Sequence, residues 1–437
     1  MTLAAPAEAV GTGQAPDKAA GAAAPSASAR GIVGAFETRP GRVLLILSVW
    51  AMICLGAMVL LFVVWRLTPP GTLGSVTPND FSAFWAAGRM ALEAGPVATL
   101  NPATLAPVQL YEPATGGREH YFPFLYPPAW LVTSLPLGAL SYAVAYPLFV
   151  VLSFLGFMAA CTLIAPPGAL ARRRTTFAML AGGALLMFAQ VYAGQLTLLW
   201  TAALIASLAL AERGRPVAAG LVLGLCSIKP TLCLLLPIAV IASGDRRYIA
   251  SASVSVILVA ALPTLWTGPE YWSAWLGALA EQSDRAGNNI ESLRGMLSWY
   301  AVLRDLGIDQ PAATAMHALV TLTAAVAVGI AWWRAGIPFA ARAGLLLIAI
   351  PFASPYAWYY ELAVVFAGML YLGRAGWGRS PVSWVLFLIV WALGGFLPFL
   401  SSIIEFRYLM APLVTVAFIA ALAQTGLIGQ RAARLLG

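Results

Sequence analysis

Long runs of apolar residues recur along most of this chain and constrain its fold more than any other feature. A helix rises about 1.5 Å per residue, so a run of about 20 residues crosses the roughly 30 Å of hydrocarbon in a bilayer. Hydrophobic residues make up 61% of the 437 residues and charged residues only 10%, which excludes an ordinary soluble domain. Because helices satisfy their own backbone hydrogen bonds in lipid, the sequence predicts an all-α integral membrane protein.

Arginine clusters between the apolar runs predict the orientation of the chain. Positively charged residues in short loops collect on the cytoplasmic side, so placing the clusters there puts both termini in the cytoplasm. Most acidic residues then fall in outer loops. Because the arginines are scattered in small groups rather than along one surface, the net charge of +8 does not indicate a nucleic-acid partner. The clusters are Arg39 and Arg42, Arg172 to Arg174, Arg213 and Arg215, Arg246 and Arg247, Arg334 and Arg342, Arg374 and Arg379, and Arg431 and Arg434.

About twelve transmembrane segments satisfy this arrangement. The predicted segments are 43–65, 141–165, 177–192, 196–211, 217–228, 231–243, 248–266, 313–333, 341–353, 359–373, 382–402 and 409–428. They form a single catalytic domain over residues 41–430, after a disordered cytoplasmic tail at 1–40 and before a short cytoplasmic tail at 431–437. Two long outer loops, 66–140 and 267–312, are predicted to carry interfacial helices.

Two regions are too short for a pair of full crossings and predict helical hairpins that turn back within the membrane. The first, 217–243, has its apex at Lys229 and Pro230, where proline removes a backbone donor and breaks the helix. The second, 341–373, has its apex between Ser354 and Glu361. Broken helices at membrane depth usually line a cavity, so both apexes are candidate site regions.

Asp80 follows the first apolar run and stands before an aromatic helical segment. It is placed to cap that helix, which would be a structural role. It is also placed to act as a general base at the membrane surface. The residues alone leave both interpretations open.

Several short motifs together resemble glycosyltransferase family 87. These are the Asp80 segment, Tyr111-Glu112-Pro113, Tyr126-Pro127-Pro128 with Pro136-Leu137, Gly194-Gln195, the stretch from Gly220 to Ile228-Lys229-Pro230, and Ser354-Pro355-Tyr356. Each motif is weak alone, whereas their order and spacing are fairly specific over about residues 40–425. The resemblance implies the GT-C membrane fold and an activity similar to that of polyprenyl-phosphate-mannose-dependent mannosyltransferases of bacterial cell envelopes.

The same resemblance implies the reaction and its place in the cell. A sugar, mannose or another hexose, would leave a polyprenyl-phosphate donor and join a hydroxyl of a lipid or glycan acceptor with inversion at the anomeric carbon. An acidic residue of the first outer loop acts as base in such enzymes, and Asp80 occupies the matching position. The site would face outward from the bacterial inner membrane. One base and a cation for the phosphate suffice, because a lipid phosphate is already a competent leaving group.

Lys229 is the first candidate for binding the donor phosphate, since an ionisable residue at membrane depth is expensive and indicates function. The alternative is a lysine that snorkels to the interface. Arg89 is a second candidate, although a contact to solvent or a lipid headgroup explains it equally well.

The second apex supplies further candidates for substrate binding. Tyr356, Tyr359 and Tyr360 can hydrogen-bond to a sugar or stack on its ring, and Glu361 is a candidate buried acid. An aromatic belt at the membrane interface is the alternative for the tyrosines. Some members of the resembled family have histidine near this apex, where this chain has tyrosine and glutamate.

The remaining substrate-binding candidates are Gln195, Tyr126, His120 and Asn289. Turn formation is the alternative for Gln195 and Asn289. His317 lies in an apolar segment and fits a packed residue better than a ligand. The four cysteines have no metal-ligand spacing, so neither a metal site nor a cofactor is expected.

Two other classes of protein compete with the enzyme. A secondary transporter or flippase of a lipid or sugar also contains broken helices with a charge at the midplane. Transporters usually have internal repeats and short connections, whereas this chain has two long aromatic loops and no clear repeat. A scaffold protein without activity would not depend on Asp80.

Overall fold

The computed structural model describes residues 39–67, 79–111, 121–288, 293, 295–395 and 406–429. Helices hold 80% of the described residues, which form no strand and only one isolated bridge, between Met296 and Trp358. The predicted all-α class is therefore confirmed. The predicted tails at 1–40 and 431–437 lie outside the described residues, apart from Arg39 and Pro40, which begin the first helix.

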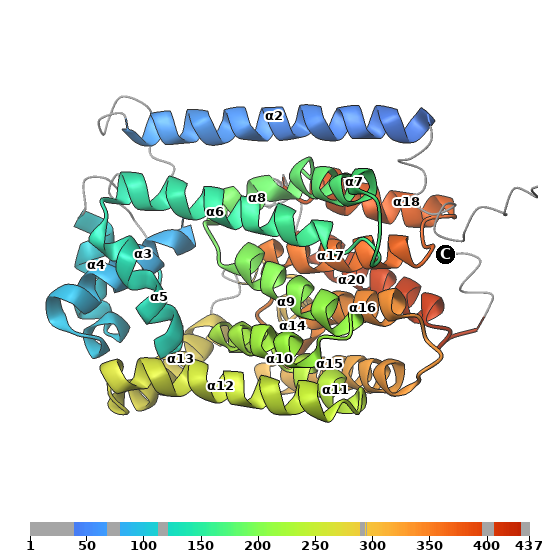
Figure 1. The fold of residues 1–437 in the computed structure, drawn as a ribbon. Coiled ribbons are helices and arrows are strands. Elements are labelled where there is room, and N and C mark those ends of the chain that lie inside the picture. The colour runs from blue at the N-terminus through green and yellow to red at the C-terminus, as the bar shows by residue number, and fades with distance from the viewer. Residues whose placement is uncertain are drawn as a thin grey trace, which may run out of the picture.

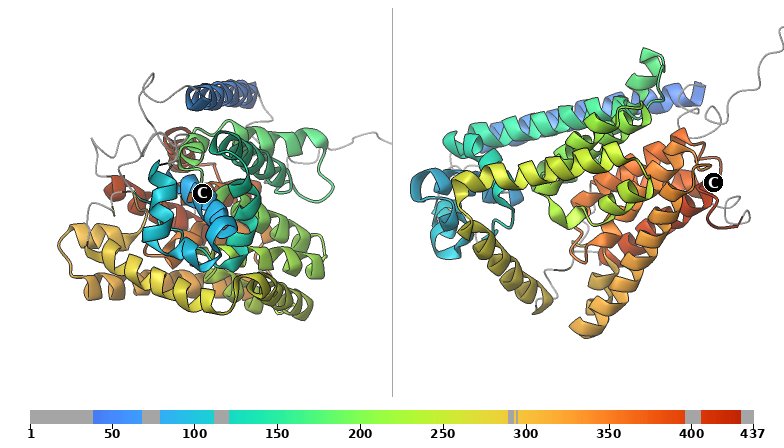
Figure 2. Two further views of the ribbon diagram at one scale, coloured as in Figure 1. Left: turned by 90° about the vertical axis from the view of Figure 1, so that its left-hand side faces the viewer. Right: turned by 60° about the horizontal axis from the view of Figure 1, so that its bottom comes forward.

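Eighteen helices of the described residues build one bundle (Figure 1). They are α2 (Arg39–Leu67), α3 (Asn79–Ala94), α4 (Pro102–Tyr111), α5 (Pro128–Ala139), α6 (Tyr142–Thr162), α7 (Ala171–Gly182), α8 (Leu186–Ala193), α9 (Thr197–Glu212), α10 (Pro216–Gly224), α11 (Leu235–Ala242), α12 (Arg246–Thr267), α13 (Glu270–Asn288), α14 (Trp299–Asp305), α15 (Gln310–Trp333), α16 (Phe339–Ala349), α17 (Leu362–Arg374), α18 (Pro381–Leu388) and α20 (Phe406–Gln424). The short helices α3, α4 and α5 gather at one end, and α2 and α12 lie on opposite sides of the bundle (Figure 2).

Three helices of the described residues are long and apolar enough to cross a membrane by themselves: α6, α12 and α15. The bent pair α7 and α8 makes a fourth span if it is counted as one. The predicted count of about twelve is not confirmed, because most of the other apolar helices have only 10–17 residues. The chain is a helical membrane protein in which breaks shorten many of the helices.

One break falls inside the predicted segment 177–192, so the prediction of a continuous helix there was wrong. α7 ends at Gly182 and α8 begins at Leu186 with a bend of 60°. A Cβ on Gly183 would lie 2.4 Å from the carbonyl oxygen of Ser48, so glycine allows α2 to approach this point closely. The freed Leu185 N–H donates to the carbonyl of Trp391 at 2.8 Å. A neighbouring segment thus satisfies the backbone at the break.

The first predicted hairpin is present as α10 and α11 with a break at Lys229, where φ is −120° and ψ is 77°. A Cβ on Gly220 would lie 2.0 Å from Ser251 Oγ, and one on Gly224 would lie 2.3 Å from the Ser255 Cβ. Because α10 meets α12 in this parallel register, α11 must return the chain to the end where α10 began. Small residues four apart let helix backbones approach closely in a membrane.

The second predicted hairpin is present as α16 and α17, which pack antiparallel. The short 3-10 helices η7 (Ile350–Ala353) and η8 (Tyr359–Glu361) flank its apex. A Cβ on Gly344 would lie 2.6 Å from the tip of the Leu372 side chain. At the end far from the apex, the Arg374 guanidinium pairs with the Glu212 carboxylate of α9 and donates to the carbonyl of Ile164 at 3.0 Å.

The helix that carries Asp80 is held tightly against α5. A Cβ on Gly88 would lie 2.1 Å from the carbonyl oxygen of Ser134, and one on Gly138 would lie 2.1 Å from the amide nitrogen of Arg89. Trp85 Nε1 donates to the carbonyl of Leu140 at 3.0 Å. The backbone of α3 is therefore locked by close packing, and the position of its first turn is well defined.

Candidate functional site

The two hairpin apexes meet at a buried ion pair. Lys229 Nζ lies 2.6 Å from Glu361 Oε1 and donates to Thr197 Oγ1 at 3.0 Å. Lys229 is 6% exposed and Glu361 2% exposed. Since an isolated charge buried this deeply is strongly unfavourable, each residue requires the other. Sequence patterns singled out both residues but did not predict that they pair.

Glu361 is held on both carboxylate oxygens. Its Oε2 accepts the Trp358 backbone N–H at 2.6 Å, while its Oε1 faces Lys229. Glu361 also directly precedes α17, where the helix dipole favours a negative charge. These contacts all stabilise the ionised carboxylate.

A chain of side-chain hydrogen bonds runs beside the ion pair. The Tyr126 hydroxyl donates to Gln195 Oε1 at 3.1 Å, and Gln195 Nε2 donates to the Tyr360 hydroxyl at 3.3 Å. The Leu196 backbone N–H also donates to Gln195 Oε1, at 2.8 Å. Gln190 Nε2 donates to the Tyr360 carbonyl and so fixes the backbone of the second apex. Three of the predicted site residues, Tyr126, Gln195 and Tyr360, are therefore in direct contact.

Asp80 lies in the first turn of α3 and is half-buried. Burial raises the pKa of Tyr126, and the negative charge of Asp80 raises that pKa further. The Asp80 carboxylate thus lies within electrostatic range of the Tyr126 hydroxyl. The Asp80 carboxylate also interacts favourably with the dipole of α3, so its position fits the helix-capping interpretation as well.

Packing beside Asp80 couples α3 to the turn that carries Gln195. Gly194 ends α8 with φ of +62°, a conformation that glycine adopts without strain. A Cβ at this position would lie 2.5 Å from the Cβ of Phe81, the residue after Asp80. The Phe81 ring also packs edge-on against Tyr146 of α6, with centroids 5.3 Å apart. Direct backbone contact at Gly194 thus sets the distance between Asp80 and Gln195.

The Lys229 ammonium group faces one ring of an aromatic cluster. Its Nζ lies 4.9 Å from the centroid of the Tyr360 ring. The Tyr360 ring stacks with Trp358 at 6.4 Å and meets Tyr359 edge-on at 5.2 Å. A cation over an aromatic face is stabilised by the ring quadrupole. The same ring faces are suited to pack against the apolar face of a sugar.

Two predicted site residues lie elsewhere in the described structure. Arg89 pairs with Glu93 on the surface of α3 at 3.0 Å and covers the Trp85 ring at 5.5 Å, so the headgroup or solvent interpretation fits it better than a phosphate contact inside the site. The Tyr356 hydroxyl shares a hydrogen bond with Ser283 of α13 at 3.0 Å. It links the second apex to α13 rather than facing Lys229.

His120 and Asn289 lie outside the described residues. Thr197 is a site residue that the sequence did not indicate, and its only signal is its position two residues after Gln195. No group of three metal-ligating side chains occurs in the part of the chain that the structure describes.

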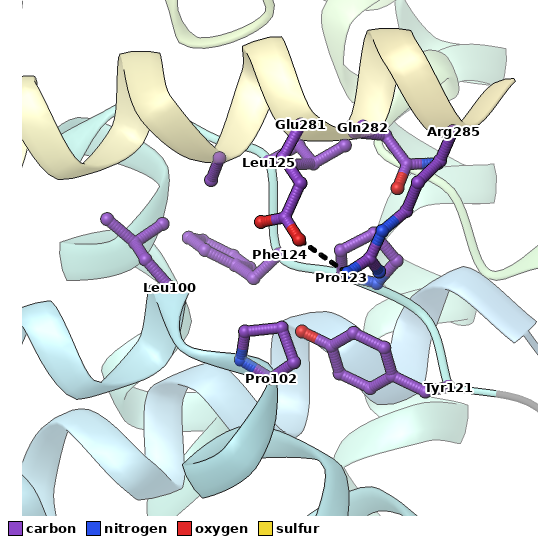
Figure 3. A pocket seen from close by; sticks show the side chains of 10 residues that line it. Leu100, Pro102, Tyr121, Pro123, Phe124, Leu125, Glu281, Gln282 and Arg285 are labelled. Carbon is purple, nitrogen blue, oxygen red and sulfur yellow. Dashed lines mark hydrogen bonds and ion pairs between the residues drawn. The ribbon is translucent and has the colours of Figure 1, made fainter. Parts of the chain in front are cut away.

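Two hollows adjoin α5 or the segment before it. A small pocket of about 20 Å³, enough for roughly one water molecule, lies between α13 and the segment before α5; Figure 3 shows Tyr121 facing Arg285 across it. It is too small to bind a sugar. A larger groove of about 290 Å³ lies between α5 and α12 and is lined by Val132, Leu135, Leu262, Pro263 and Trp266. Because this lining is entirely apolar apart from the indole nitrogen, the groove suits a hydrocarbon chain.

These features define a class: a helical membrane protein with an acid, a buried ion pair and clustered aromatic hydroxyls where broken helices meet. The family follows from sequence comparison. The model of glycosyltransferase family 87 matches residues 124–355, more than half of the chain, and the chain belongs to this family. It is a membrane glycosyltransferase. No curated protein and no solved structure matches the chain. The matched range includes Tyr126, Gln195 and Lys229 but neither Asp80 nor Glu361.

Proposed function

We propose that this protein transfers a sugar, mannose or another hexose, from a polyprenyl-phosphate donor to a hydroxyl of a lipid or glycan acceptor, with Asp80 as general base. The transfer takes place at the outer face of the bacterial inner membrane, in a fold of the GT-C type, without a cofactor. One observation carries the proposal. Asp80 precedes Phe81, which packs against Gly194 directly before Gln195. Gln195 belongs to a hydrogen-bonded cluster with Tyr126 and Tyr360 that adjoins the buried Lys229–Glu361 pair.

The reaction is a direct displacement. Asp80 takes the proton of the acceptor hydroxyl while the hydroxyl oxygen attacks the anomeric carbon of the donor sugar. The bond between that carbon and the phosphate oxygen breaks, and the bonding electrons leave with the lipid phosphate. Attack from the face opposite the leaving group inverts the anomeric carbon. A single base is sufficient, since no second carboxylic acid is needed to protonate the leaving group.

Lys229 is the proposed cation for the donor phosphate. An ammonium group has three donors, and two of them serve Thr197 and Glu361. The third remains for an oxygen of the phosphate, whose negative charge grows as the glycosidic bond breaks. Glu361 and Thr197 hold Lys229 in place for this contact, so both act as positioning residues.

A lipid-borne donor accounts for the surroundings of the site. The apolar groove between α5 and α12 is the proposed location of the isoprenoid chain. On its other side, α5 packs closely against α3, the helix that carries Asp80. The aromatic rings of Tyr359 and Tyr360 supply faces for the sugar. The arginine clusters predict that this end of the bundle faces outward.

Sugar transfer by the purified full-length chain tests the proposal. Polyprenyl-phosphate sugars and a membrane extract as acceptor are supplied, and Asp80→Asn is compared with the parent. Loss of a general base is expected to lower kcat by about 10²–10⁴-fold without lowering the unfolding temperature. Glu93→Gln is the matched control on the same helix, since Glu93 lies on the surface with Arg89.

Equal transfer by Asp80→Asn and the parent would remove Asp80 from the mechanism. Transport of a lipid-linked sugar in proteoliposomes without any glycosyl transfer would instead favour the transporter or flippase, whose broken helices and buried charge resemble those here.

A further inference from the structure

The Gln195 side chain has a defined orientation, from which a further role for Tyr360 follows. The Leu196 backbone N–H lies 2.8 Å from one end of the Gln195 amide. A backbone N–H can only donate, so this end must be the oxygen. The Tyr126 hydroxyl, which contacts the same atom at 3.1 Å, must therefore donate to it. The other end is then the NH₂ group, which donates to the Tyr360 oxygen at 3.3 Å.

Because the Tyr360 oxygen accepts this bond, its own O–H proton needs another acceptor. The described residues form no such bond, and Tyr360 is only 7% exposed. A buried donor without an acceptor is costly. We therefore expect the reacting complex to supply an acceptor for the Tyr360 hydroxyl. The ring has little freedom to turn away, since Trp358 and Tyr359 pack against it and Gln190 holds its backbone carbonyl.

Two carboxylates lie near this hydroxyl. Glu361 follows Tyr360 in the chain, and Asp80 precedes Phe81, which packs against Gly194 directly before Gln195. Glu361 already accepts from Lys229 and from the Trp358 backbone N–H. A carboxylate has about four lone-pair sites, so Asp80 can accept a further bond beside its existing contacts. The other charged or titratable groups that face these residues are Lys229, Tyr126, Tyr359, Tyr192 of α8, and Tyr142 and Tyr146 of α6.

We propose that Tyr360 is a positioning residue for the Asp80 base: in the reacting complex its hydroxyl donates to the Asp80 carboxylate, and Gln195 sets the direction of that hydroxyl. The inference rests on the function proposed above. The bond occupies one carboxylate oxygen and leaves the other for the acceptor hydroxyl. It also stabilises the ionised form, so the base stays deprotonated to lower pH than it would alone.

The pH dependence of kcat, measured at saturating donor and acceptor, tests this role with the purified full-length chain and a polyprenyl-phosphate sugar, because kcat reports the groups of the enzyme–substrate complex. The acid limb of the parent profile reports the base, and Asp80→Asn should abolish it. Tyr360→Phe keeps the ring and removes only the hydroxyl. It is expected to move the acid limb up by about one pH unit, the size expected for a lost hydrogen bond to a charged group.

Tyr248→Phe is the matched control. The Tyr248 hydroxyl is also buried and shares a hydrogen bond with Ser207 at 2.9 Å, at the start of α12 and away from the site. Its loss should lower stability about as much as the loss at Tyr360 and leave the acid limb unchanged.

Gln195→Met tests the orienting step, because it keeps the length of the side chain and removes both amide groups. The substitution should move the acid limb in the same direction as Tyr360→Phe. In the Tyr360→Phe background it should add no further shift, since both act through one hydroxyl.

An acid limb that stays at the parent pH in Tyr360→Phe would overturn the proposal, whether or not kcat falls. A lower kcat with an unchanged limb would mean that the hydroxyl contacts substrate rather than Asp80. An additional shift of the acid limb when Gln195→Met is combined with Tyr360→Phe would show that Gln195 does not act through the Tyr360 hydroxyl. These results differ from a failure of the proposed function, in which Asp80→Asn would keep the parent activity.

Discussion

The hairpins α10–α11 and α16–α17 each turn back at a proline-containing break, and the two breaks meet at the Lys229–Glu361 ion pair. The first apex is compact and supported from inside the bundle, where Trp200 Nε1 of α9 donates to the Cys226 carbonyl at 2.8 Å. The second apex is wide and is supported by the segment before α14. There the Leu297 N–H donates to the Ala357 carbonyl at 2.7 Å.

This difference indicates that the two apexes have different roles in the site. A compact apex packed on α12 and α9 presents one cation with little freedom. A wide apex presents several groups, a carboxylate and aromatic rings, and depends on an outer segment for its shape. Substitutions in the segment before α14 should therefore affect the position of Glu361 more than that of Lys229. Three predictions test this asymmetry.

The largest effect is expected from breaking the ion pair on one side. Lys229→Met leaves the Glu361 carboxylate buried and unpaired, and Glu361→Gln leaves the Lys229 ammonium in the same state. Each should lower the free energy of unfolding by about 3–5 kcal/mol, and the double variant should recover much of the loss. Unfolding in detergent, followed by circular dichroism, measures all three. Donor use should also fall in Lys229→Met.

The pH dependence of Lys229→Met sharpens this test. Without Lys229 the buried Glu361 carboxylate has no counter-charge, so burial favours its protonated form. A folded-state pKa above the unfolded value of about 4.3 means that the folded state binds the proton more tightly. The variant should therefore be most stable below about pH 4 and lose stability as the pH rises through the folded-state pKa. A variant as stable as the parent at neutral pH would show that the pair is dispensable for folding.

A smaller effect is expected from filling the helix contacts. In Gly224→Ala the new Cβ would meet Ser255 Cβ at 2.3 Å and the Ser255 backbone carbon at 2.9 Å, so α10 and α12 must separate. In Gly344→Ala the nearest atom is the movable tip of Leu372. We expect Gly224→Ala to cost about 1–3 kcal/mol and Gly344→Ala less.

Gly277→Ala is the control for the glycine pair. Gly277 lies within α13 and has no neighbouring atom within 4 Å of a new Cβ, so alanine should be neutral or stabilising there. Unfolding temperatures compare the three variants. Equal losses at Gly224 and Gly344 would contradict the view that the α10–α12 contact is less adaptable than the α16–α17 contact.

The smallest effect is expected from Ser298→Ala. Ser298 Oγ donates to the Pro355 carbonyl and accepts the Ala301 N–H at the start of α14 at 3.3 Å. Its loss should cost about 1 kcal/mol and increase hydrogen exchange in residues 355–361 while residues 225–233 stay protected. In Ser227→Ala, which removes a local bond to the Gly224 carbonyl at 2.7 Å, residues 355–361 should exchange as in the parent. Faster exchange at both apexes in Ser298→Ala would contradict the inference that the segment before α14 supports only the second apex.

Much of the architecture could be predicted from local signals. Proline and short length marked both hairpins, and the helix breaks at Lys229 and between Ser354 and Tyr359 are present in the structure. The break at Gly183 was missed because it depends on contact with Ser48 and Trp391, which are distant in sequence. The count of about twelve spans is not confirmed for a related reason, since apolar composition does not reveal where a neighbouring segment replaces helical hydrogen bonds.

The amino-acid sequence by itself determined that this chain uses lipid as its solvent, that it is helical, and that it belongs with the membrane glycosyltransferases. It also marked Asp80, Lys229 and Glu361, because charge within apolar surroundings is visible without coordinates. Only the tertiary structure decided that Lys229 pairs with Glu361 and that Gln195 directs the Tyr360 hydroxyl. Such partners lie 132 and 165 residues apart, and local patterning carries no information about contacts made by packing alone.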